Sequence, residues 1–272
     1  MRNYKSDFFD YVKFMEEIRE PFRIEYTNGM YQIFSALHGK REFKNGTISM
    51  KGMNFIKTIK NRIIKSEIIE KIPKKTPKEL GLKYLLFNDH YMGKTMDNII
   101  ELDLNSAYWK SAYKLGIISK KDYYKGLQQP KLERLASLGS LAKTVRVREF
   151  NGRKYSKVTI KNDSQDTRHV WFAISSEVDK LMLKCAKELK DQFVFYWVDA
   201  LFFIDTPENR KKVQSMVKEA GYDSKFIKIL FAKFDPDSAK VWSKEKGKLD
   251  PEHNAKKRFF CYDINNKEQF QK

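Results

Sequence analysis

Two aspartates stand in apolar surroundings, where a carboxylate is costly unless it has a partner or a task. Asp199 interrupts the apolar and aromatic run DQFVFYWVDALFFID, residues 191–205, and Asp103 lies in NIIELDL, residues 98–104. Two carboxylates that a fold brings together repel each other, and a divalent cation between them removes the repulsion. The pair therefore predicts a metal site, although Asp199 taken alone is equally well explained as a turn residue.

The elements around the two aspartates predict how they meet. NIIELDL alternates as a strand, which places Asp103 on the face opposite Leu102 and Leu104. Further along, the pattern predicts a helix over 173–192, strands over 193–198 and 201–205 around a tight turn, a helix over 207–222 and a strand over 225–234. With residues 106–168 set aside as an insertion, the order is βαββαβ, the ferredoxin-like arrangement, in which the first strand lies beside the central hairpin in one antiparallel sheet.

The amino-terminal part is predicted to be a separate, basic α+β lobe. It contains an amphipathic helix over 7–19, a hairpin around Asn28-Gly29, a basic helix over 53–72 and a proline-punctuated connector over 72–79. We therefore divide the chain into residues 1–87, residues 88–262 with the insertion at about 106–168, and a carboxy-terminal tail over 263–272.

The charge balance indicates an anionic partner. Among 272 residues, 54 Lys and Arg face 35 Asp and Glu, which gives a formal net charge of +19. Such a field favours nucleic acid, and the interspersed Tyr and Phe favour a folded surface over a basic tail. Two cysteines and scattered histidines speak against a disulfide framework or a zinc site, and no signal peptide or membrane span is visible. We expect a cytoplasmic protein with no membrane partner.

A second hairpin is predicted around Asn151-Gly152 in TVRVREFNGRKYSKVTIKN, residues 144–162. It carries Arg146, Arg148, Arg153 and Lys154, side chains that suit a nucleic-acid backbone. The alternative is a solvated hairpin whose charges discourage edge-to-edge pairing.

At this point the motifs resemble those of B-family DNA polymerases, especially the protein-primed group of phages and plasmids. DLNSAY, residues 103–108, is similar to the first palm motif, D-x-x-S-L-Y, and FYWVDALFF, residues 195–203, to the third, Y-x-D-T-D-S. KLERLASLGSLAK, residues 131–143, resembles the helical second motif, with Ser137 matching. YMGK at 91–94 and KRF at 257–259 are similar to the elements that flank the palm, so the resemblance covers about residues 88–262 in the family's order.

The resemblance implies roles for particular residues and partners. Asp103, Asp199 and the backbone of Leu104 would bind two Mg²⁺ or Mn²⁺ ions that serve phosphoryl transfer. The expected nucleotide-binding residues are Ser106, Ala107, Tyr108, Lys131, Arg134 and Ser137, with Tyr108 excluding a 2′-hydroxyl. The expected nucleic-acid contacts are Tyr91, Gly93, Lys257 and Arg258, together with the basic hairpin. The implied partners are a DNA primer-template, deoxynucleoside triphosphates, and other polymerase subunits or a terminal protein, in a bacterial or phage-infected cell.

The sequence also departs from the family's pattern. Trp197 replaces the first aspartate of the third motif, and Ala136 and Gly139 replace the Asn and Tyr of the second. The fingers shrink to about residues 110–130, and no exonuclease signature is visible. Three hypotheses remain open: a minimal exonuclease-free DNA polymerase, alone or as one chain of a split enzyme; a primase-like or template-independent transferase; and a non-catalytic palm that binds nucleic acid.

Overall fold

The structure, a computed structural model, describes residues 4–27, 30–44, 48–161, 165–235, 238–243 and 256–259. The protein belongs to the α+β class and contains two antiparallel sheets, which confirms the expected class. The chain divides into two compact units, and each of them is assembled from separate segments. Unit 1 comprises residues 1–74 and 116–172, and unit 2 comprises residues 75–115 and 173–272.

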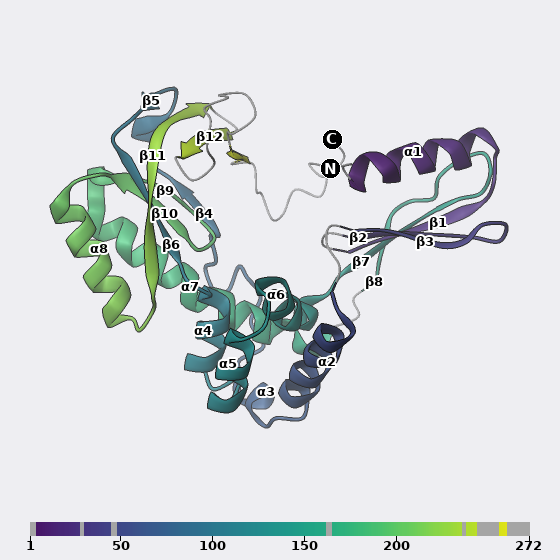
Figure 1. The fold of residues 1–272 in the computed structure, drawn as a ribbon, viewed down its shortest axis with the longest axis horizontal. Coiled ribbons are helices and arrows are strands. Elements are labelled where there is room, and N and C mark those ends of the chain that lie inside the picture. The colour runs from purple at the N-terminus through teal and green to yellow at the C-terminus, as the bar shows by residue number, and fades with distance from the viewer. Residues whose placement is uncertain are drawn as a thin grey trace. The chain divides into compact units, whose positions relative to one another are not determined.

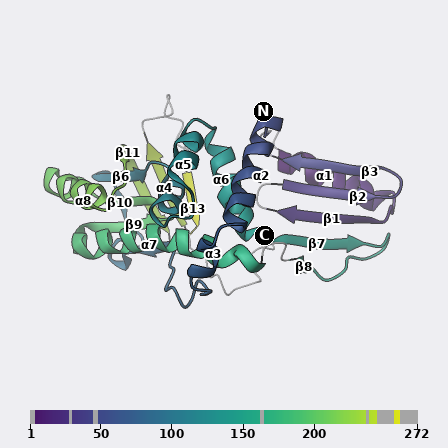
Figure 2. The same cartoon turned by 90° about the horizontal axis from the view of Figure 1, so that it is seen from below.

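Unit 1 is built on a sheet of strand order β3-β2-β1-β7-β8. Its elements are α1 (Tyr4–Glu17), β1 (Phe22–Thr27), β2 (Met30–Ser35), β3 (Gly39–Lys44), α2 (Met50–Ile64), α3 (Ile68–Lys71), α5 (Lys120–Leu127), α6 (Lys131–Gly139), β7 (Val145–Phe150) and β8 (Thr159–Lys161). The amphipathic helix α1 buries Phe8 and Met15 against Phe22, Ile33 and Phe43 of the sheet. It lies chiefly over β2 and β3 (Figure 2).

Side-chain hydrogen bonds to backbone N–H groups explain where α2 and α3 of unit 1 begin. The predicted amino-terminal helix and the strands around Asn28-Gly29 are present, and β1 pairs with β2 as far as Thr27 and Met30, while the turn itself lies outside the described residues. The single helix predicted over 53–72 is divided into α2 and α3. α2 already starts at Met50, because the Ser49 hydroxyl accepts the Gly52 N–H at 3.0 Å. Between the helices, Ser66 accepts the N–H of Ile68 at 3.3 Å and starts the next turn.

Unit 2 is built on a larger antiparallel sheet (Figure 1). Its elements are β4 (Leu85–Phe87), the 3₁₀ helix η1 (Asp89–Tyr91), β5 (Thr95–Met96), β6 (Ile99–Leu104), α4 (Ala107–Lys114), α7 (Arg168–Leu189), β9 (Phe193–Trp197), β10 (Ala200–Ile204), α8 (Pro207–Glu219), β11 (Ser224–Asp235), β12 (Ser238–Ser243) and β13 (Lys256–Phe259). The first five residues of α7 belong to unit 1.

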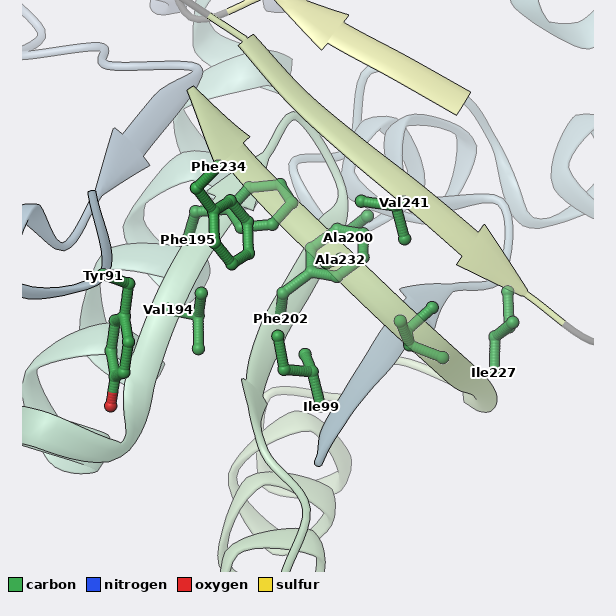
Figure 3. Packing of buried hydrophobic residues seen from close by; sticks show 11 residues of the cluster. Tyr91, Ile99, Val194, Phe195, Ala200, Phe202, Ile227, Ala232, Phe234 and Val241 are labelled. Carbon is green, nitrogen blue, oxygen red and sulfur yellow. The ribbon is translucent and has the colours of Figure 1, made fainter. Parts of the chain in front are cut away.

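The strand order of this sheet follows the expected βαββαβ pattern. Within the order β13-β12-β11-β6-β10-β9-β4, strand β6 lies between β10 and β11 and is antiparallel to both. One face carries a cluster formed by Ile99, Phe195, Phe202, Ile227 and Phe234 (Figure 3), in which the rings of Phe195 and Phe202 stack at 4.1 Å. The helices α7 and α8 lie together on the other side of the sheet (Figure 1).

The two units do not follow the boundaries expected from the sequence. Residues 85–87 were assigned to the first lobe, but β4 pairs with β9 and so belongs to the sheet of unit 2. The insertion expected at 106–168 was treated as part of the second domain, but β7 pairs with β1, which joins residues 116–172 to the amino-terminal lobe. Both differences arise from pairing between strands far apart in the chain. The predicted tail over 263–272 lies outside the described residues.

Candidate active site

Asp103 lies near the end of β6, at the centre of the sheet of unit 2. Its direct partners across the sheet are Ala200 on β10 and Lys225 on β11, and all three side chains belong to the same face. Asp103 is half-buried, whereas Leu102 and Leu104 on the opposite face are buried. The expected alternation of β6 is therefore present, and it presents Asp103 on the face of the sheet opposite the helices α7 and α8.

Asp199 lies in the two-residue turn that joins β9 to β10. The N–H of Leu104 donates to the carbonyl oxygen of Asp199 at 3.1 Å, directly beyond the pairing of Asp103 with Ala200. The two aspartates therefore occupy the same end of neighbouring strands although 96 positions separate them in the sequence. Both are half-buried, so both remain accessible to solvent.

Left-handed backbone conformations gather around this end of the sheet. Ser106, which follows Asp103 and precedes α4, has φ 52° and ψ 40°, and Val198, which immediately precedes Asp199, has φ 62°. Tyr84, which contacts the same turn, has φ 54°. A β-branched valine at positive φ is a particularly unfavourable choice. Strained residues of this kind concentrate at functional sites, where the surrounding structure holds them in place.

The turn that carries Asp199 is anchored by a buried carboxylate that sequence reasoning missed. Asp179 of α7 accepts the N–H groups of Lys83 and Tyr84 at 3.1 and 2.8 Å and the hydroxyl of Tyr196 at 2.9 Å. The carbonyl of Tyr84 in turn accepts the N–H of Val198 at 2.7 Å. Asp179 thus fixes the segment that holds the turn. No local signal in the sequence marked Asp179, because Ser175, Ser176 and Glu177 precede it on a mixed helix.

Tyr108 lies near Asp199, at the start of α4. It is buried, as is Ala107 before it. Burial, and then the negative charge of Asp199, raises the pKa of the Tyr108 hydroxyl well above its usual value. The hydroxyl therefore stays protonated at neutral pH. The role of Tyr108 beneath the sugar, which the resemblance implied, stays a prediction.

The residues present suit a hard divalent cation. Asp103 and Asp199 offer carboxylate oxygens, and Mg²⁺ is typically bound by one or two carboxylates together with water and substrate phosphates. In the described ranges no group of three or more His, Cys, Asp or Glu side chains forms a complete metal cage. The backbone of Leu104 remains a predicted ligand.

The predicted nucleotide-binding residues of the second motif lie on α6, in unit 1. Lys131 is exposed at the start of this helix. Arg134 donates to the carbonyl of Gln129 at 2.5 Å, between α5 and α6. Ser137 is buried and donates to the carbonyl of Glu133 at 2.8 Å. Arg134 and Ser137 therefore have structural bonds within unit 1, and their contact with a nucleotide stays a prediction.

The predicted nucleic-acid contacts have different surroundings. Tyr91 is buried in the core of unit 2, where its hydroxyl donates to the carbonyl of Asp191. Gly93 has φ 75°, and its N–H donates to the carbonyl of Phe234 at 3.0 Å. Arg148, Arg153 and Lys154 are exposed and Arg146 is half-buried on the expected hairpin of unit 1, whose strands pair from Val145 and Lys161. The backbone of Lys257 and Arg258 forms part of β13, and their side chains lie outside the described set.

Comparison with known proteins adds no family assignment. No model of a protein family matches the chain, and no curated protein matches its sequence. Within the described residues, no helix has the length and apolar character needed to cross a membrane. The functional argument therefore depends on the motifs and on the geometry of unit 2.

Proposed function

We propose that the protein is a minimal, exonuclease-free DNA polymerase, a nucleotidyltransferase that extends a primer by two-metal phosphoryl transfer. The observation that carries the proposal is the placement of Asp103 and Asp199 at the same end of β6 and the β9–β10 hairpin, within the strand order β11-β6-β10-β9. The polymerase-like motifs, in the family's order, and the strong net positive charge support the same conclusion.

Each of these residues would have a separate role in the reaction. Asp103 and Asp199 would hold two Mg²⁺ or Mn²⁺ ions, which when bound activate a primer 3′-hydroxyl and neutralise the triphosphate. Tyr108, kept protonated and buried, would form the surface beneath the sugar and favour a deoxynucleotide. The network from Asp179 through Tyr84 to Val198 would hold Asp199 in position, since phosphoryl transfer depends mainly on positioning and charge.

A primase-like or template-independent transferase is the second candidate. The structure of α6 favours it, because Arg134 and Ser137 bond to carbonyls of unit 1 and the Asn and Tyr of the second motif are replaced by Ala136 and Gly139. Without the Asn and Tyr side chains of the second motif, this helix would select the incoming nucleotide weakly. Whether the product follows the template separates this candidate from the polymerase.

The first prediction concerns primer extension on a primed single-stranded DNA template with Mg²⁺ or Mn²⁺ and all four deoxynucleoside triphosphates. Asp103→Asn and Asp199→Asn each remove a metal-binding charge without changing the shape of the side chain, and we expect each to reduce extension on the order of 10³-fold. Asp191→Asn is the matched control, because this exposed aspartate precedes β9 at the end of the strand far from the turn.

Three outcomes of this experiment are informative. Extension that follows the template and is lost only in the Asp103 and Asp199 variants supports the polymerase. Extension whose sequence ignores the template supports the second candidate. No extension by the unmodified protein, despite binding of DNA, would overturn both and leave a non-catalytic palm.

A further inference from the structure

The two faces of the sheet in unit 1 carry different charges. On one face, the strands present Arg23, Glu25, Gln32, Lys40, Glu42 and Lys44, where the basic groups are neutralised by Glu25 and Glu42. On the other face, named the arginine face here, the strands present Phe22, Ile24, Tyr26, Tyr31, Ile33, Arg41, Phe43, Arg146, Arg148, Phe150 and Ile160. None of these strand residues is acidic, so the arginine face of the described strands is positively charged.

Helix α1 covers only part of the arginine face. Its contacts run to Tyr31, Phe43, Phe22 and Phe150, and Arg41 lies over the ring of Tyr11 at 4.3 Å. Glu16 of α1 accepts the hydroxyl of Tyr155, in the segment between β7 and β8. In the part formed by the ends of β1, β7 and β8, called the open part here, Ile160 is 53% exposed. Arg148 is also exposed, and its guanidinium lies over the ring of Tyr155 at 4.3 Å.

In the open part, aromatic side chains and arginines lie next to each other on neighbouring strands. The rings of Phe8 and Tyr31 stack at 4.1 Å and those of Tyr31 and Tyr26 at 4.6 Å, so Tyr26 ends a ladder of stacked rings. Tyr26 lies directly opposite Arg146 of β7, and Arg146 lies opposite Ile160 of β8. Arg146 and Arg148 are two residues apart on one strand, which separates them by roughly 6.6 Å along it, a spacing comparable to that of neighbouring phosphates in an extended single strand.

From these observations we propose that the arginine face, at Tyr26, Arg146, Arg148 and Ile160, binds single-stranded DNA. The two arginines would contact consecutive phosphates, and Tyr26 and Ile160 would receive unstacked bases, which a duplex does not expose. The sequence predicted nucleic-acid contacts on the basic hairpin alone. The proposed surface adds Tyr26 and Ile160, on the same face of the sheet, to the arginines of that hairpin. It is independent of Asp103 and Asp199, so its binding does not require that the proposed polymerase reaction takes place.

The test is binding of a fluorescently labelled oligothymidylate of about 16 nucleotides, measured by anisotropy at several salt concentrations. All variants are made in the full chain with Asp103→Asn, so that turnover plays no part. Arg146→Gln with Arg148→Gln is expected to weaken binding at least tenfold and to reduce the slope of log K against log salt by about 1.4, which corresponds to two phosphate contacts. Tyr26→Leu is expected to weaken binding about tenfold with little change in slope.

Matched control variants distinguish binding at the arginine face from attraction by the net positive charge of the whole protein. Lys40→Gln with Lys161→Gln removes the same charge from the opposite face of the same sheet and is expected to change affinity less than twofold. Tyr26→Phe keeps the ring and should bind normally, which shows that the ring and not the hydroxyl is needed. Equal losses from both double variants, or equal affinity for duplex and single-stranded DNA, would overturn the proposal. Undiminished binding by Arg146→Gln with Arg148→Gln would also overturn it, because the oligonucleotide would then bind elsewhere on the chain.

Discussion

The carboxylate of Asp103 has a cation opposite it across the sheet, and this neighbour should affect the binding of metal. Lys225 is exposed and directly pairs with Asp103 in the register of β6 and β11. A fixed ammonium group repels a divalent cation at the same site, although solvent screens exposed charges strongly. Under the proposed function, Lys225→Gln should therefore lower the Mg²⁺ concentration that gives half-maximal primer extension, by about two- to fivefold.

Lys228 provides the control for this prediction. It lies on the same strand, three residues further on, and is also exposed, but it pairs with Ile100 and so belongs to the opposite face of the sheet. Lys228→Gln removes the same charge and should leave the Mg²⁺ dependence unchanged. If the two substitutions shift the Mg²⁺ titration equally, then only the net charge matters and Asp103 is not at the metal.

Sequence reasoning found some residues of the site and missed others for a physical reason. Asp103 and Asp199 were predictable, because a carboxylate inside an apolar strand or hairpin contrasts with its neighbours. Asp179 was not, since Ser175, Ser176 and Glu177 precede it on an ordinary mixed helix. Its burial depends on the distant N–H groups of Lys83 and Tyr84, which local periodicity cannot reveal.

At the scale of elements, the packing of α2 against α6 depends on a glycine. A Cβ atom added at Gly52 would lie 2.0 Å from Oε1 of the buried Glu133, whose carboxylate also accepts the Ser49 hydroxyl at 3.3 Å. Alanine normally stabilises a helix relative to glycine by about 1 kcal/mol. Here the sign should reverse, and Gly52→Ala should lower the free energy of unfolding by about 1–3 kcal/mol, because Glu133 has to leave its buried position.

Gly139→Ala is the matched comparison, measured by urea unfolding of both variants. Gly139 is the last residue of α6, has φ −60°, and an added Cβ would meet no heavy atom within 4 Å. We expect this substitution to be neutral or stabilising by up to about 1 kcal/mol. A stabilising Gly52→Ala would show that α2 and α6 do not approach as closely as described here.

The elements themselves were largely predictable, and their assembly was not. Alternation and capping located β6, the β9–β10 hairpin and α8, where Thr206 accepts the Asn209 N–H at 3.2 Å and Pro207 occupies the first turn as expected. The division into units was missed because β4 pairs with β9 and β7 pairs with β1. Such pairings join segments more than 100 residues apart, and nothing in the local pattern encodes them.

At the scale of the whole molecule, the two proposals assign different ligands to different units. Hydrogen exchange can therefore separate them in one protein. Mg²⁺ with a deoxynucleoside triphosphate should slow exchange near the aspartates, especially at the amides of Leu104 and Val198, whose bonds to Asp199 and Tyr84 close the end of the hairpin. An oligothymidylate should slow exchange along β7 and β8 in unit 1.

The expected protection follows from binding linkage, since a ligand at ten times its dissociation constant slows exchange through local opening about tenfold. Asp103→Asn should abolish the effect of Mg²⁺ and nucleotide in unit 2 and leave that of the oligonucleotide in unit 1. Arg146→Gln with Arg148→Gln should do the reverse. If nucleotide protects unit 2 even without Asp103, the metal assignment is wrong; if the oligonucleotide protects only unit 2, the arginine face is not its binding site. Each proposal can therefore fail without the other, because the residues that carry them lie in different compact units of the chain.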